Sequence, residues 1–175
     1  NAFKNSSIES ISIPSKLIEL QPGWCYMTKN LTKITISPNN QRFIYSNDQF
    51  IIGKSNIEQP YYDSLFFARR DIEAAIIPTF IKSIEPCSFD DCERLREIKI
   101  SNESKLQIIG ANAFAFSKIE YIYLPIHLTR ICENAFYFCN KLKKVEIPKE
   151  SELKFIDRNA FFATAISDFY LPIHV

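Results

Sequence analysis

The side chains that could act as acids, bases or nucleophiles recur at repeated positions of this sequence. Histidine, the usual general base near neutral pH, occurs only as His127 and His174, and both lie in the same tetrapeptide, Leu-Pro-Ile-His. The residues of a catalytic site hold different roles, so copies of one position are not expected to form one. Three glycines are too few for a phosphate-binding loop. The sequence therefore predicts a protein that is not an enzyme and binds no cofactor.

The five cysteines could form disulfides, bind a metal or remain thiols. They are Cys25, Cys87, Cys92, Cys132 and Cys139. An odd number cannot pair completely within one chain, and without a Cys-x-x-Cys spacing neither a zinc site nor a redox motif is indicated. Cys92 and Cys139 each lie three residues after a phenylalanine, which suggests a structural thiol at a turn. We predict free thiols and no metal site, while a Cys87–Cys92 or Cys132–Cys139 bridge stays open for an extracellular protein.

The histidines and most of the cysteines lie in copies of one sequence repeat, which is clearest around Phe136. A small residue precedes Phe136, and the apolar triplet Leu142, Val145 and Ile147 follows it. The same pattern surrounds four other phenylalanines, namely Phe3, Phe89, Phe114 and Phe161. Two degenerate copies have the triplets Leu31/Ile34/Ile36 and Ile72/Ala75/Ile77. Spacings of 22 or 25 residues are typical of leucine-rich repeats. We predict one β-rich, right-handed solenoid over residues 1–175, with about seven coils and little helix.

The Ala-Phe pair, the triplet and the proline after it resemble the BspA-like leucine-rich-repeat surface proteins of bacteria and parasitic protists. The prolines are Pro14, Pro78, Pro125, Pro148 and Pro172. The resemblance covers residues 1–36 and 72–175, although Trp24-Cys25 replaces one Ala-Phe pair. It implies a non-enzymatic protein at the cell surface or secreted, which binds a protein of a host cell, a neighbouring cell or the matrix. The alternative is a cytoplasmic scaffold that binds proteins through the same sheet.

Residues 37–71 interrupt the repeat, as an insert or a remodelled coil. Phe43-Ile-Tyr45 and Phe50-Ile-Ile52 flank the polar segment 46–49, which predicts a β-hairpin. Leu65-Phe-Phe67 predicts a third short strand. The chain begins and ends within a repeat, so we expect it to be a piece of a longer protein.

The triplets also predict which side chains face solvent. If the last two members of each triplet point inward, the residue before each of them points outward. These outward pairs are Ser10/Ser12, Lys33/Thr35, Ala74/Ile76, Glu97/Lys99, Tyr121/Tyr123, Lys144/Glu146 and Asp168/Tyr170. Strands about 4.8 Å apart would arrange the seven pairs as one parallel sheet roughly 30 Å long. We expect the apolar Ile76 to lie under the insert.

Exposed aromatic side chains make part of this sheet a candidate protein-binding site. Tyr121, Tyr123 and Tyr170 would form its centre, because aromatic residues are enriched in interfaces. The charged residues at its rim would be Glu97, Lys99, Lys144, Glu146 and Asp168. A purely structural interpretation stays open, since tyrosine suits exposed strands and opposite charges pair across them.

The overall charge and hydropathy exclude two classes of partner. The net charge is +1 and the basic residues are dispersed, so no nucleic-acid-binding face is indicated. No apolar stretch is long enough to span a membrane. The sequence does not indicate an oligomeric state.

Overall fold

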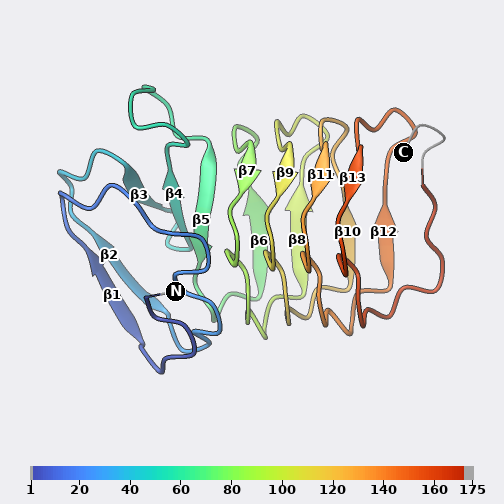
Figure 1. The fold of residues 1–175 in the computed structure, drawn as a ribbon, viewed down its shortest axis with the longest axis horizontal. Helices are drawn as coiled ribbons and strands as arrows, with labels where there is room; N and C mark the ends of the chain where they lie inside the picture. Colours follow the sequence, from blue (N-terminus) through green and yellow to red (C-terminus); the bar gives the residue numbers. More distant parts are fainter. Residues whose placement is uncertain (1, 172–175) are drawn as a thin grey trace.

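The computed structural model describes residues 2–171, which form short strands joined by turns and contain no helix (Figure 1). The strands are β1 (Ser10–Ile13), β2 (Lys33–Ile36), β3 (Phe43–Ser46), β4 (Phe50–Gly53), β5 (Ser64–Ala68), β6 (Ala74–Ile77), β7 (Ser83–Ile84), β8 (Glu97–Ile100), β9 (Ile108–Ile109), β10 (Tyr121–Tyr123), β11 (Arg130–Ile131), β12 (Lys144–Glu146) and β13 (Phe155–Ile156). Successive coils lie side by side along the long axis, which confirms the predicted solenoid.

Two sides of the solenoid carry its sheets. The strands of the apolar triplets form one side, as a two-stranded parallel sheet, β1-β2, and a four-stranded parallel sheet in the order β12-β10-β8-β6. The segments that follow the triplets form the other side, together with the strands of the insert, in a seven-stranded sheet of order β13-β11-β9-β7-β5-β4-β3. Each coil from β6 onward therefore contributes one strand to each sheet, and its apolar side chains meet between them.

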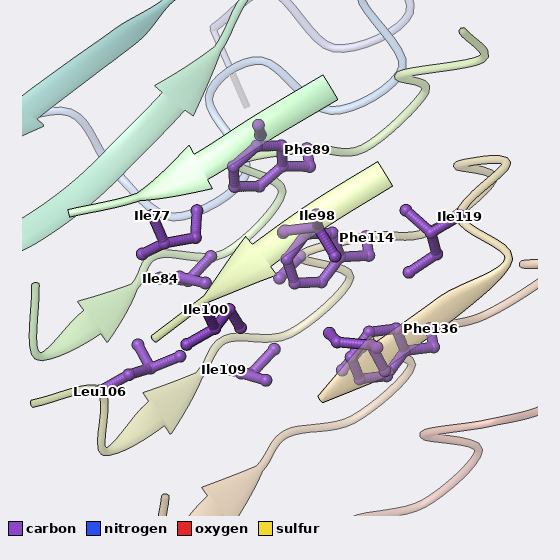
Figure 2. Packing of buried hydrophobic residues seen from close by; sticks show 14 of the residues in the cluster. Ile77, Ile84, Phe89, Ile98, Ile100, Leu106, Ile109, Phe114, Ile119 and Phe136 are labelled. Carbon is purple, nitrogen blue, oxygen red and sulfur yellow. The ribbon is translucent and has the colours of Figure 1, made fainter. Parts of the chain in front are cut away.

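A row of phenylalanine rings fills the interior. The rings of Phe89, Phe114, Phe136 and Phe161 stack from coil to coil, with centroids 4.8, 5.2 and 5.0 Å apart. Figure 2 shows the first three rings following one another beside the buried isoleucines of both sheets. Burial of one such ring stabilises the fold by roughly 1.5–3 kcal/mol, and a favourable ring pair adds roughly 0.5–1.5 kcal/mol. The repeated anchor phenylalanine thus joins each coil to the next, beside the backbone pairing of the two sheets.

The turn around each anchor phenylalanine uses two left-handed residues. Asn112 and Asn134 lie two residues before their anchors with φ of 54° and 56°, which suits asparagine. Phe116 and Phe138 lie two residues after the same anchors with φ of 61° and 56°. A bulky side chain is unusual in this conformation and raises its energy by roughly 1–2 kcal/mol. Local preference therefore supports the turn at the asparagines, whereas at Phe116 and Phe138 the stacking of the coils must impose it.

The insert forms the predicted hairpin. Strands β3 and β4 pair antiparallel, and β5 pairs antiparallel with β4 and parallel with β7, so the insert extends the seven-stranded sheet. Phe50 of β4 packs against Phe89 with ring centroids 6.0 Å apart. The coil of β6 has no anchor phenylalanine of its own, and Phe50 takes that place.

Three details differ from the expectations. The outward-facing sheet is not continuous, because β3, β4 and β5 join the opposite sheet and leave β2 and β6 unpaired with each other. The seventh triplet strand does not form: residues 168–170 pair with no strand, and no further coil shields them within the described residues. Ile76 is 66% exposed, since the insert packs over the opposite side of the solenoid and leaves this face open.

Candidate protein-binding surface

The outward-facing strands alternate as the triplets predicted. In β8, Glu97 and Lys99 are exposed while Ile98 and Ile100 are buried, and β6 has the same pattern. In β10, Tyr121 is 40% exposed, Ile122 is buried and Tyr123 is half-buried. The register places Tyr121 beside Glu97 on one side and Lys144 on the other. The sheet therefore brings together six of the eight candidate residues: Glu97, Lys99, Tyr121, Tyr123, Lys144 and Glu146.

Three of these side chains form one hydrogen-bonded group around Glu146. The Tyr121 hydroxyl donates to Glu146 Oε2, and the Lys144 ammonium donates to Glu146 Oε1. Lys144 Nζ also lies 5.8 Å from the centroid of the Tyr121 ring, within cation–π range. On β8, Lys99 Nζ pairs with Glu97 Oε1 at 3.0 Å. These contacts hold the Tyr121 ring in one orientation on the sheet surface.

The electrostatics of this group fix its protonation states. Burial and the hydrogen bond to Glu146 raise the pKa of the Tyr121 hydroxyl to about 12. Hydrogen bonds from Lys144 and Tyr121 hold the pKa of Glu146 below its ordinary value. Near neutral pH, Tyr121 is therefore a neutral hydrogen-bond donor and Glu146 is ionised. In these states the hydroxyl donates and the carboxylate accepts, so the hydrogen bond between Tyr121 and Glu146 persists near neutral pH.

The other two candidate residues lie beyond the last strand. Tyr170 is 80% exposed, and Asp168 accepts a hydrogen bond from the neighbouring Ser167 hydroxyl at 2.9 Å. Within residues 2–171, no hydrogen bond or ring contact joins Tyr170 to the group around Tyr121. The structure thus brings the β10 and β12 residues together but leaves this pair separate.

A second exposed aromatic cluster lies at the turns after the anchor phenylalanines. Phe116, Tyr137, Phe138 and Phe162 come from three successive coils, and neighbouring ring centroids are 4.7–5.8 Å apart. Phe138 and Phe162 are 39% and 51% exposed. The sequence analysis missed this cluster, although aromatic residues at the first or second position after consecutive anchors would have indicated it.

A buried polar cluster joins the first two coils to the rest. Arg70 is 2% exposed, and its guanidinium donates to the carbonyls of Ser88 and Cys87 at 2.8 and 3.1 Å. Nearby, the Met27 amide donates to Asp90 Oδ2 at 2.7 Å. Burial raises the pKa of Asp90 to about 7, although the nearby Arg70 charge opposes this. Because these groups face backbone atoms and are enclosed, we interpret the cluster as structural.

The remaining chemical candidates give no site. All five cysteines are free thiols, and four are buried. His127 is exposed and lies 3.1 Å from Glu152, while His174 falls outside the described residues. Within residues 2–171 no group of acidic, histidine or cysteine side chains is arranged to hold a metal ion, and no helix could cross a membrane.

Comparisons with known proteins identify the repeat family and similar structures. The family description for the BspA type leucine-rich repeat region matches residues 1–59 and 61–175 in six copies, whereas no curated protein matches the chain. Among solved structures, the pneumococcal vaccine antigen PcpA superposes with a TM-score of 0.81 at 22% identity, over 94% of this chain and 39% of PcpA.

Two further bacterial structures share the fold. A leucine-rich cell surface protein from Faecalibacterium prausnitzii has a TM-score of 0.62 at 19% identity, over 97% of this chain and 54% of that protein. A leucine-rich-repeat protein from Eubacterium ventriosum has a TM-score of 0.55 at 17% identity, over 95% of this chain and 61% of that protein. The chain thus spans less than two thirds of each of the three proteins. Because the repeat pattern matches along nearly the whole sequence and its coils are stacked in the structure, this chain belongs to the BspA-type leucine-rich-repeat family.

Proposed function

We propose that this chain is a non-enzymatic protein-binding module at a cell surface, where it adheres to proteins of another cell or of the matrix. The observation that carries the proposal is the exposed, hydrogen-bonded aromatic group on β10 and β12. Tyr121 combines a ring that partners can contact with a hydroxyl whose position Glu146 fixes. A side chain already held in place loses little rotamer entropy on binding, so such residues contribute strongly to interfaces.

The charged residues around Tyr121 would supply the rim of this interface. Glu97, Lys99 and Lys144 are exposed and lie on the strands beside β10. Rim charges of both signs change association rates and specificity more than affinity. The partner is therefore expected to present an apolar or aromatic centre with mixed charges around it, and Tyr170 would contribute only to a larger footprint.

The surface location is supported by exposed glycosylation sequons and by the family. Asn5, Asn30 and Asn102 each begin an Asn-x-Ser/Thr sequon, and all three residues are exposed. The Faecalibacterium prausnitzii relative is described as a cell surface protein. These observations favour secretion, and the experiment below tests adhesion separately.

The test measures adhesion of beads coated with this chain to epithelial monolayers and to plates coated with matrix extract. We expect the wild type to adhere and the double variant Tyr121→Ala, Tyr123→Ala to lose at least tenfold in bound beads. The control is Tyr61→Ala, which removes another tyrosine that is 51% exposed but lies outside the sheet. Circular dichroism should show the same fold for all three. Equal adhesion by the double variant would exclude the tyrosine site, and no adhesion by the wild type would exclude the adhesive function.

A cytoplasmic scaffold is the second candidate, because the buried thiols are unpaired. Disulfides are rare in the reducing cytosol, where such thiols persist. Mass spectrometry of the native protein separates the two candidates: five reduced thiols with unoccupied sequons favour the cytosol, and glycans on Asn5, Asn30 or Asn102 favour secretion.

A further inference from the structure

The interruption of the outward-facing sheet leaves β6 with one unpaired edge. β6 pairs only with β8, and the Glu97 amide donates to the Glu73 carbonyl across this pair. Along a parallel strand, the amide and carbonyl of one residue face one neighbouring strand, and those of the next residue face the other. The backbone groups of residues 73, 75 and 77 therefore bond to β8, while those of Ala74 and Ile76 face the break. Within residues 2–171, neither the Ala74 amide nor the amide and carbonyl of Ile76 has a backbone partner.

One contact confirms the direction in which this edge points. The side-chain amide of Gln49, from the hairpin, donates to the Ala74 carbonyl at 3.4 Å. This carbonyl therefore faces away from β8. At the same position in β8 and β10 the neighbouring strand fills this role, so Gln49 is a partial substitute for a missing strand.

The side chains of this edge do not block pairing with another strand, and Gln49 covers only its start. Exposed edges usually carry charged residues, proline or a bulge. β6 instead has the sequence Ala-Ala-Ile-Ile, with Ala74 and Ile76 both exposed, and its proline, Pro78, follows the strand. Ile76 is 66% exposed, compared with 40% for Tyr121 inside the same sheet. The difference is expected when a strand has a neighbour on one side only.

Two hollows lie at the residues that precede β6, next to the start of its open edge. A cleft of about 440 Å³ is lined by residues that precede β1, β2, β6 and β8, including Glu9, Thr32, Asp71 and Glu93. A second hollow of about 200 Å³ is lined by Gln49, Asp71 and Ile72. Figure 1 shows β1 and β2 set apart from the stacked coils and tilted relative to them.

We propose that the open edge of β6 binds an extended segment of a partner protein, which lies parallel to β6 and continues its sheet into the break. The occupant follows from the unpaired groups, because backbone donors and acceptors that recur every second residue are complemented by the backbone of another strand. Side chains at alternate positions of that segment would lie beside Ile76 on the outward face. This site is separate from the tyrosine surface, so either proposal can fail alone.

The strand β2 suggests a probe with a known register. β2 adds to β1 in parallel, with the Lys33 amide donating to the Glu9 carbonyl and the Ser37 amide to the Ile13 carbonyl. The backbone amides and carbonyls of Ile34 and Ile36 therefore face away from β1. A strand that pairs with the open edge of β6 must present its backbone groups in this way. A peptide of residues 30–37, added to the intact chain, should place the amides of Ile34 and Ile36 against Ala74 and Ile76.

Backbone methylation of this peptide separates strand pairing from side-chain adhesion. In fluorescence anisotropy, the peptide methylated at the amides of Lys33 and Thr35 should bind, because its pairing edge is intact. The peptide methylated at Ile34 and Ile36 has the same side chains but lacks the donors, and should bind roughly tenfold more weakly or worse. Equal binding of the two, or no binding of either, would overturn the proposal.

A pair of protein variants tests the same edge from the other side. Ile76→Pro removes the outward amide and keeps the donors of Ala75 and Ile77 that face β8, so peptide binding should fall at least tenfold. Ile76→Val keeps the amide and should bind like the wild type. If Ile76→Pro does not fold, amide exchange of the wild type decides: peptide should slow exchange at Ile76, and an unchanged rate counts against the site. Sedimentation of the wild type and of Ile76→Pro completes the test. If the wild type forms a dimer and Ile76→Pro does not, a second copy of this chain occupies the edge, and the proposal of a segment from another protein is refuted.

Discussion

Removing one ring from the phenylalanine row should measure how strongly the coils hold one another. Phe136 is fully buried and stacks on Phe114 at 5.2 Å and on Phe161 at 5.0 Å, nearly parallel to both. Truncation of a buried phenylalanine to alanine generally costs about 3–5 kcal/mol. We expect Phe136→Ala to lie at the upper end, because it removes contacts at two coil interfaces at once and a solenoid's stability is the sum of such interfaces. A loss of this size is a large part of the total free energy of unfolding of a protein of this length.

The matched control is Phe162→Ala, which makes the same chemical change at a residue 51% exposed and should cost less than about 1 kcal/mol. Urea unfolding followed by far-ultraviolet circular dichroism reports on all coils. Fluorescence of Trp24 reports on the second coil only, which is distant along the chain from Phe136. If Phe136→Ala and Phe162→Ala shift the unfolding midpoint equally, the ring row does not carry the stability that we assign to it.

Two further predictions concern buried titratable groups. Because burial raises the pKa of Asp90 to about 7 in the folded state, the native protein binds a proton that the unfolded chain releases near pH 4, and stability should fall as the pH rises between these values. Asp90→Asn should therefore be more stable than the wild type by roughly 2–4 kcal/mol at pH 8 but not at pH 4 in urea titrations, and an equal difference at both would contradict the assignment. Alkylation of the native protein at pH 8 should modify Cys132 first. Burial raises the pKa of this thiol too, but it is the one cysteine that is only half-buried, whereas burial raises the pKa of Cys25 and Cys139 to about 12. Rapid modification of several thiols, read by intact mass, would show that the coils open in solution.

The repeat made much of the fold predictable. The spacing of each triplet alone indicated that Ile98, Ile122 and Val145 would be buried and that their neighbours would face solvent, and the structure confirms this alternation. The hairpin of the insert was also predicted, because a polar segment between two apolar runs is a local signal. Such signals are contained within a few residues, so they can be recognised without knowing what packs against them.

The errors arose where distant segments decide the outcome. Sequence spacing could not show that β3, β4 and β5 would join the sheet opposite the triplets, and this choice interrupts the outward sheet between β2 and β6. It also could not show that Phe50 would replace a missing anchor phenylalanine. The aromatic cluster around Phe138 was missed although its residues recur just after consecutive anchors, and the contacts between their rings form only when the three coils stack.

The sequence by itself determined the coil, because the anchor phenylalanine and the triplet specify within each repeat which atoms must leave water. Only the tertiary structure decided which coils become neighbours. That choice sets the partners of Tyr121 and the unpaired edge of β6, since a hydrogen bond or a stacked ring depends on a second segment whose position no single repeat encodes.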